Sequence, residues 1–174
     1  IPLRRQRQMC IRDSRNGAPI TKDTIQDAVE GSLKRLKTDY IDLYQFHWPN
    51  RGSYMFRQNW KYDPSKQDKK ITLENMYECL VTLQDQVEKG NIRHFGLSNE
   101  SAWGTANWLR LSEQHNLPRV ATIQNEYSLL CRLYDTDLAE LSVNEGVGLM
   151  AFSPLAAGLL TGKYLDGNIP VSYT

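Results

Sequence analysis

The chain has 174 residues, of which 40% are hydrophobic and 24% are charged, and its formal net charge is +1. This is the composition of an ordinary globular domain, and a charge so close to zero does not favour a nucleic-acid-binding protein. No apolar run reaches the roughly 18 residues that a membrane-spanning helix needs, and no apolar segment of the kind found in signal peptides follows the N-terminal arginines. We therefore expect a cytoplasmic protein that binds neither nucleic acid nor membrane.

The three cysteines, Cys10, Cys79 and Cys131, lie far apart in the sequence and form no Cys-x-x-Cys pair. This spacing argues against a disulfide framework and against a cysteine-rich zinc site, and it suits a reducing compartment. The sequence also contains no His-Glu-x-x-His motif, so we expect no metal.

The first fourteen residues, IPLRRQRQMCIRDS, follow neither the helical nor the strand period. We interpret residues 1–14 as a non-native or disordered tail and residues 15–174 as one domain. Within that domain, apolar residues at helical spacing predict a helix over 24–36. A short apolar run rich in β-forming residues predicts a strand over 40–47, and a long polar loop follows over 48–71.

The second half of the chain continues the alternation of helix and strand. Ser101 is a suitable N-cap, while Gly90 and Gly146 stand where helices are expected to stop. Such alternation indicates a parallel sheet, either doubly wound or closed as a (β/α)8 barrel. Since a whole barrel needs about 250 residues, we expect only part of one. The predicted helices span 73–89, 101–115 and 135–144, and the predicted strands span 92–98, 120–124 and 148–153.

Ligands of parallel α/β folds bind at the carboxyl ends of the strands. Each of the four predicted strands ends in a pair that includes a polar or aromatic residue. We predict that these pairs contribute to one pocket at that edge of the sheet. The pairs are His47-Trp48, Ser98-Asn99, Gln124-Asn125 and Phe152-Ser153.

Four blocks of the sequence resemble those of one known family. They are SLKRLKTDYIDLYQFHWP (32–49), GNIRHFGLSN (90–99), IQNEYSLL (123–130) and AFSPLAAGLLTGKY (151–164). Their order and spacing resemble those of the aldo-keto reductases, in particular a Tas-like bacterial subgroup with a long loop after the histidine strand. The resemblance covers roughly residues 22–169.

This resemblance implies a fold, an activity and a cofactor. The fold is α/β, a partial (β/α)8 TIM barrel of about four parallel strands with intervening helices. The activity is NADPH-dependent reduction of aldehydes or ketones to alcohols, with a small carbonyl compound as the substrate and NADP(H) as the cofactor. The family's catalytic Asp, Tyr and Lys precede the histidine and have no match here. We therefore expect a fragment that lacks both ends of the barrel and is inactive by itself.

By the same resemblance, His47 is the active-site histidine, whose imidazole N–H orients the substrate carbonyl. The two-residue period of strands predicts that it faces the barrel interior together with Gln45, Leu43 and Ile41. Trp48 would line the substrate pocket. The residues alone leave two alternatives open: a buried His47 that is satisfied by the backbone, and a Trp48 that only packs within its loop.

The resemblance also implies the cofactor contacts. Ser98, Asn99 and Gln124 resemble the set that binds the nicotinamide carboxamide, because hydroxyl and amide side chains both donate and accept hydrogen bonds. Ser98 and Asn99 are also common helix-capping residues, which is the alternative. Phe152 stands where the family places an aromatic ring that stacks on the nicotinamide. On the pyrophosphate side the implied contacts are Ser153, Leu155, Gly158 and Lys163.

A second function, from another class, shares these blocks. It is a cofactor-binding regulatory subunit of the same fold, like the β-subunit of a potassium channel. The Phe-Ser-Pro-Leu and Gly-Lys strings fit both functions, and the Tas-like loop favours the enzyme. The sequence predicts neither the physiological substrate nor the oligomeric state.

Overall fold

The computed structural model describes residues 8–11, 19–55 and 58–165. Its centre is a parallel sheet of five strands, in which neighbours along the chain are also neighbours in space. Because every pair is parallel, the carboxyl ends of the strands lie along one edge of the sheet. The strands are β1 (Gln8–Ile11), β2 (Ile41–Phe46), β3 (Ile92–Ser98), β4 (Val120–Glu126) and β5 (Gly148–Phe152).

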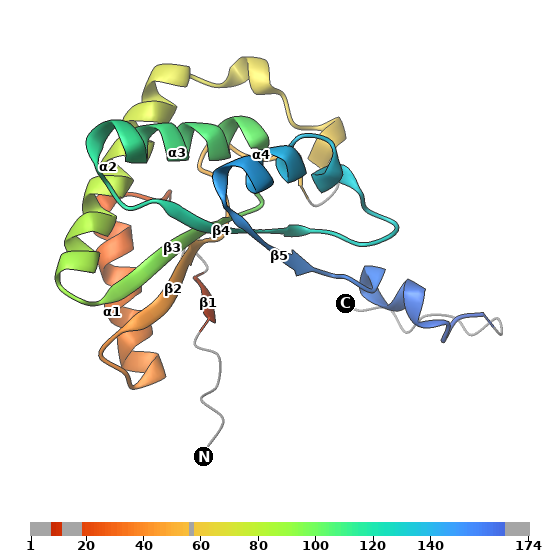
Figure 1. Ribbon diagram of the computed structural model, residues 1–174, viewed down its shortest axis with the longest axis horizontal. Helices are drawn as coiled ribbons and strands as arrows, with labels where there is room; N and C mark the ends of the chain where they lie inside the picture. Colours follow the sequence, from red (N-terminus) through yellow and green to blue (C-terminus); the bar gives the residue numbers. More distant parts are fainter. Residues whose placement is uncertain (1–7, 12–18, 56–57, 166–174) are drawn as a thin grey trace.

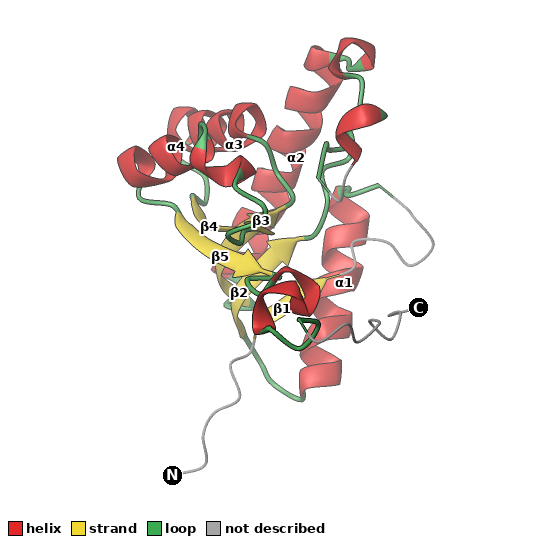
Figure 2. Ribbon diagram, turned by 90° about the vertical axis from the view of Figure 1, so that its right-hand side faces the viewer, coloured by secondary structure: helices red, strands yellow, loops and turns green. Residues whose placement is uncertain are grey.

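Four helices lie along one side of the curved sheet (Figure 1, Figure 2). They are α1 (Lys22–Leu36), α2 (Lys69–Glu88), α3 (Ala102–His115) and α4 (Leu138–Glu145). In the described part of the chain, the loops hold the short 3-10 helices η2 (Gln58–Trp60), η3 (Pro64–Lys66), η4 (Leu133–Asp135) and η5 (Ala156–Thr161). A sheet whose strand order follows the chain, with helices on one side, is the arrangement predicted for part of a (β/α)8 barrel, and the prediction is confirmed.

The hydrophobic core lies between the sheet and this layer of helices. Phe46, Phe95 and Trp108 form an aromatic cluster whose ring centroids are 5.6 to 6.2 Å apart. Leu80 and Leu83 of α2 are fully buried beside it. Each such side chain contributes about 1.5–3 kcal/mol by leaving water, so the core holds the helices against the sheet.

The other side of the sheet is the inner side, and its curvature is visible in one long contact. The side-chain amide of Gln45 in β2 reaches the sulfur of Met150 in β5 over 3.8 Å, although β3 and β4 lie between these strands. Gly96 lies between them on the same face, where a Cβ would overlap the hydroxyl of Thr122. By strand alternation His47 would continue this inner face beyond Gln45, and this orientation stays a prediction.

Local signals in the sequence account for several helix ends. The Thr21 hydroxyl accepts from the backbone of Thr24 at the start of α1, and Ser101 caps α3 by accepting from Gly104 over 3.1 Å. Gly146 ends α4 in the left-handed conformation, with a φ of 66°. The predictions for Ser101 and Gly146 are therefore confirmed.

The structure differs from the predicted elements in several places, most clearly in one strand that was missed and in two helix starts. Residues 1–14 were expected to contain no strand, but β1 pairs with β2 in parallel register over 8–11, and so the sheet has five strands. The helix predicted from residue 73 begins at Lys69, because Asp68 caps it by accepting from the backbone of Ile71. The helix predicted from residue 135 begins at Leu138, because Leu133–Asp135 forms η4.

Candidate functional site

Three of the predicted strand ends are joined by hydrogen bonds at the carboxyl edge of the sheet. The Ser98 hydroxyl donates to the backbone carbonyl of Gln124 over 2.8 Å, and the Asn99 backbone N–H donates to the same carbonyl over 3.0 Å. The Asn99 side-chain amide donates to the backbone carbonyl of His47 over 2.8 Å. The ends of β2, β3 and β4 are thereby held in a fixed relation to one another.

Asn99 occupies the centre of this arrangement. Its side chain is 1% exposed, and its φ of 56° lies in the left-handed region, which Asn tolerates better than most residues. The amide nitrogen also donates to the Ser98 hydroxyl over 3.1 Å. The amide oxygen has no hydrogen-bond partner among the described residues. This buried oxygen is therefore an acceptor that the described residues leave unused.

His47 and Trp48 follow β2 directly, and both are half-buried. The bond from Asn99 engages the main-chain carbonyl of His47 and so fixes the backbone from which the imidazole projects. Trp48 packs against the hydrophobic core, which is the packing role that the sequence left open beside substrate contact. It also borders a cavity described below.

The residues after β5 form a strained loop. Phe152 is half-buried, and its backbone carbonyl accepts from the N–H of Tyr127 over 3.2 Å. Ser153 and Gly158 both have a positive φ, of 53° and 95°. A Cβ on Gly158 would lie 2.9 Å from Cε of Lys163, which would have to move, and the φ of Gly158 also favours glycine.

Leu155 and Lys163, the other predicted pyrophosphate contacts, lie on the surface of this same segment. Leu155 is 54% exposed, and Lys163 is exposed with its Nζ 4.8 Å from the centroid of the Tyr164 ring. In Figure 1 the segment lies beyond the end of β5, on the side away from the helices. The cluster after β5 is thus separate from the hydrogen-bonded edge formed by the other strands.

A buried ion pair, which the sequence analysis did not identify, lies beside this edge. Arg51 and Glu100 have side-chain exposures of 6% and 3%, and Nη1 of Arg51 donates to Oε2 of Glu100 over 2.9 Å. Burial acts to lower the pKa of Arg51, but hydrogen bonding and attraction to Glu100 outweigh it, so the pKa is raised and the guanidinium stays charged. Ser101 also accepts from this guanidinium over 3.1 Å.

The ion pair connects the loop after β2 to the loop after β3. The Ser53 hydroxyl strengthens the same connection by donating to the backbone carbonyl of Asn99 over 2.7 Å. The two partners of the ion pair are 49 positions apart in the sequence and share no local motif. A charged residue in a predicted polar loop is ordinarily exposed to solvent, so no feature of the sequence indicated this pair.

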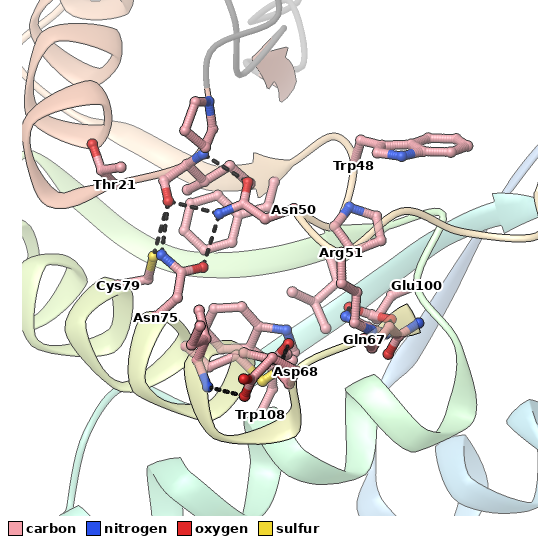
Figure 3. Close-up of a pocket in the computed structure, with 18 of the residues that line it drawn as sticks. Thr21, Trp48, Asn50, Arg51, Gln67, Asp68, Asn75, Cys79, Glu100 and Trp108 are labelled. Atoms are coloured by element: carbon pink, nitrogen blue, oxygen red, sulfur yellow. Dashed lines mark hydrogen bonds and ion pairs between the residues drawn. The ribbon is translucent and has the colours of Figure 1, made fainter. Parts of the chain in front are cut away.

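Two cavities lie near the carboxyl edge. The first has a volume of about 510 Å³ and is bordered by Trp48, Arg51 and Ser98 (Figure 3). The second, of about 530 Å³, lies among the loops after β2, β4 and β5 and is bordered by Ser153. Among the residues described, His47, Gln124 and Phe152 border neither cavity. A pocket shared by all four strand ends therefore stays a prediction.

Within residues 8–11, 19–55 and 58–165, no group of three or more His, Cys, Asp and Glu side chains is placed to hold a metal ion. Over the same described part of the chain, no helix combines the length and the apolar character needed to cross a membrane.

Comparison with known proteins gives a consistent result. The Aldo/keto reductase family matches residues 8–173. The chain is 45% identical to Protein tas of Escherichia coli strain K12 over 151 residues, and 42% identical to an aldo-keto reductase of Babesia bovis over 162 residues. It is 29% identical to aflatoxin B1 aldehyde reductase member 2 of Homo sapiens over 160 residues.

These alignments cover 87%, 88% and 90% of this chain, but only 42%, 56% and 39% of the three relatives. The chain therefore spans between about two fifths and just over half of their length. The match extends across nearly all of the described strands and helices. The chain belongs to the aldo/keto reductase family.

Proposed function

We propose that this chain carries the histidine and the nicotinamide-side contacts of an NADPH-dependent reductase of aldehydes and ketones. The observation that carries the proposal is the hydrogen-bonded edge, in which Asn99 contacts the backbone of His47 and of Gln124. A catalytic side chain and a cofactor site must keep a fixed separation for hydride transfer, and these bonds supply it.

The chemistry of Asn99 suits the carboxamide of a nicotinamide. Its buried amide oxygen has no partner among the described residues, and a primary amide carries N–H groups that donate to such an acceptor. When bound, NADPH supplies the hydride that reduces the carbonyl carbon. Ser98 and Gln124 flank Asn99 and complete the proposed contact set. Phe152 would offer its ring face to the nicotinamide.

The remaining residues have roles at the substrate and at the phosphates. His47 would donate a hydrogen bond to the substrate carbonyl oxygen and hold it in place while negative charge develops there. Trp48 would border the substrate. Lys163 would place a positive charge near the pyrophosphate, together with Ser153, Leu155 and Gly158 on the same loop.

We also propose a cytoplasmic setting. The three cysteines lie far apart in the sequence and form no Cys-x-x-Cys pair, a spacing that suits a reducing compartment.

The proposal is tested by joining this chain to the parts of a relative that it does not match. The 151 aligned residues replace their counterpart in E. coli Protein tas, so that the relative supplies the rest of the barrel. The chimera is assayed by the absorbance of reduced nicotinamide in the presence of a nitrobenzaldehyde. We expect turnover that requires both NADPH and the aldehyde.

Two results would count against this function. A folded chimera that binds NADPH but shows no turnover with any of several aldehydes and ketones would favour the regulatory subunit. A folded chimera that neither binds NADPH nor reduces an aldehyde would contradict the assigned cofactor contacts.

A further inference from the structure

The loops after β2 and β3 are joined at two points by side chains. At the first point, the side-chain amide of Asn99 donates to the backbone carbonyl of His47 over 2.8 Å. At the second point, both carboxylate oxygens of Glu100 accept from the guanidinium of Arg51 (Figure 3). The two attachments close a ring that contains residues 47–51 and residues 99–100. One hydrogen bond alone leaves rotation free, and a bidentate second attachment removes that freedom.

The ion pair also has a fixed direction, because its two side chains are held from the start of α3. The guanidinium of Arg51 donates to the Ser101 hydroxyl over 3.1 Å, and its central carbon lies 5.2 Å from the ring centroid of Trp103. The backbone N–H of Ser101 donates to the Glu100 carboxylate over 2.6 Å. A planar guanidinium with partners on several sides keeps one orientation, so the pair sets an angle as well as a distance.

The main chain between β3 and α3 depends on side-chain bonds of this kind. The Ser53 hydroxyl donates to the backbone carbonyl of Asn99 over 2.7 Å, and the buried side-chain amide of Asn125 donates to the backbone carbonyl of Glu100 over 3.0 Å. These carbonyls lie outside regular helix or strand pairing. A change at Arg51 or Glu100 is therefore transmitted to Asn99 rather than absorbed by secondary structure.

A second ion pair joins the same two strands and serves as an internal reference. Arg93 in β3 donates to Asp42 in β2 over 2.9 Å, and its guanidinium lies over the ring of Tyr40 at 4.1 Å. This pair is near the amino ends of the strands, and its side-chain exposures are 57% and 49%. It has the same kinds of contact as the buried pair, but it lies in solvent and away from His47.

We propose that Arg51 and Glu100 are positioning residues of the proposed reductase. Their ion pair sets the orientation of His47 relative to Asn99, and so aligns the substrate carbonyl with the nicotinamide. Both residues act through the loops that they join. Hydride transfer is sensitive to small displacements of the reacting groups, so residues away from the reacting atoms can control its rate. The inference rests on the proposed function, which assigns the chemistry to His47 and the cofactor contact to Asn99.

The first test uses Arg51→Lys in the chimera with Protein tas, which keeps the cation and removes the planar fork. We expect kcat with a nitrobenzaldehyde to fall by about tenfold or more, and the dissociation constant of NADPH to change by less than about twofold. The deuterium isotope effect on kcat, measured with NADPH deuterated at the transferred position, should rise because hydride transfer becomes slower than product release. Arg93→Lys is the matched control and should change none of these quantities.

A double variant separates positioning from stability. Removing one partner of a buried ion pair destabilises a fold strongly, whereas replacing both partners by apolar residues is often neutral. Arg51→Met combined with Glu100→Leu should therefore unfold at nearly the same urea concentration as the unsubstituted chain. In the chimera its kcat should stay reduced by about tenfold or more. A pair that contributed only stability would regain full kcat in this variant.

Hydrogen exchange in the chain itself tests the positioning without any catalysis. The side-chain amide protons of Asn99 are shielded by the bond to His47, and NMR follows their exchange with solvent. In Arg51→Lys they should exchange about tenfold faster, because the ring is opened at one point. The side-chain amide of Asn91, which donates to Gln86 over 2.9 Å just before β3, should exchange at an unchanged rate.

Two results would overturn the proposal. Unchanged exchange of Asn99 in Arg51→Lys would show that the ion pair does not hold this segment. Full kcat in an active chimera, with either Arg51→Lys or the apolar double substitution, would show that the pair does not align the reaction. An unsubstituted chimera without turnover contradicts the proposed reductase instead, and the exchange rates then still decide whether the ion pair holds Asn99.

Discussion

Single residues at the carboxyl edge carry more than one interaction. Asn99 adopts a left-handed backbone so that its N–H reaches the Gln124 carbonyl while its side chain reaches the His47 carbonyl. An aspartate in its place would lose the amide donor, and most other residues would be strained at this φ. Because the backbone and the side chain of Asn99 each bond a different strand end, the ends of β2, β3 and β4 keep their relative positions.

Lys163 provides a prediction at this scale. In the chimera with Protein tas, Lys163→Ala should weaken NADPH binding by about 1–3 kcal/mol, because the substitution removes a charge proposed to face phosphate. The dissociation constant is measured by fluorescence titration. Lys89→Ala, an exposed lysine at the end of α2, is the matched control and should change nothing. An unaltered constant in Lys163→Ala would remove this residue from the proposed site.

The residues of the edge were predictable from the sequence to different degrees. Ser98, Asn99 and Gln124 could be found because polar side chains end otherwise apolar strands. Arg51 and Glu100 could not, because each stands in a loop without any pattern and the pair forms only once β2 and β3 lie side by side. Long-range pairs of this kind depend on the tertiary fold.

At the scale of elements, α3 is built around a contact that only glycine allows. A Cβ on Gly104 would overlap Oε1 of Glu100 and Nη2 of Arg51, both part of the buried ion pair. Glycine has a low helix propensity, but at position 104 it allows the ion pair to pack against the backbone of the first turn of α3. Gly31 in α1 has no such neighbour, since its Cβ would meet only the flexible end of Arg35 at 3.0 Å.

These two glycines predict opposite effects of the same substitution. Gly104→Ala should lower the free energy of unfolding by about 2–4 kcal/mol, because the buried ion pair must shift. Gly31→Ala should raise it by roughly 0.5–1 kcal/mol, the usual gain of alanine within a helix. Urea denaturation of the chain measures both. A destabilised Gly31→Ala, or a neutral Gly104→Ala, would show that the packing of these helices differs from that described.

Elements with strong local signals were predicted well. Strand 92–98 was predicted with the bounds that β3 has, and Ser101 and Gly146 mark helix ends as expected. β1 was missed because four residues are too few to show a period, and pairing with β2 defines that strand. The proposal that residues 1–14 are non-native stays a prediction, since most of that segment lies outside the described residues.

At the scale of the whole molecule, the curved sheet separates two environments. The inner side carries Gln45, Gly96 and Met150, and the helix side carries the aromatic core and the cavity beside Arg51. The fold class could be predicted from the alternation of helices and strands, whereas the positions of the two cavities described above could not. Cavities depend on how the loops after β2, β4 and β5 pack, and loops show no period from which packing could be predicted.

The central claim is that His47 orients the substrate carbonyl at the edge held together by Asn99. It is tested most directly by steady-state kinetics of the Protein tas chimera with His47→Ala, compared with His115→Ala. His115 is exposed and packs against Tyr77, with 4.7 Å between the ring centroids. We predict that His47→Ala lowers kcat by about 100-fold or more, with NADPH affinity changed less than twofold, and that His115→Ala leaves kcat unchanged. Full kcat in His47→Ala would contradict the claim.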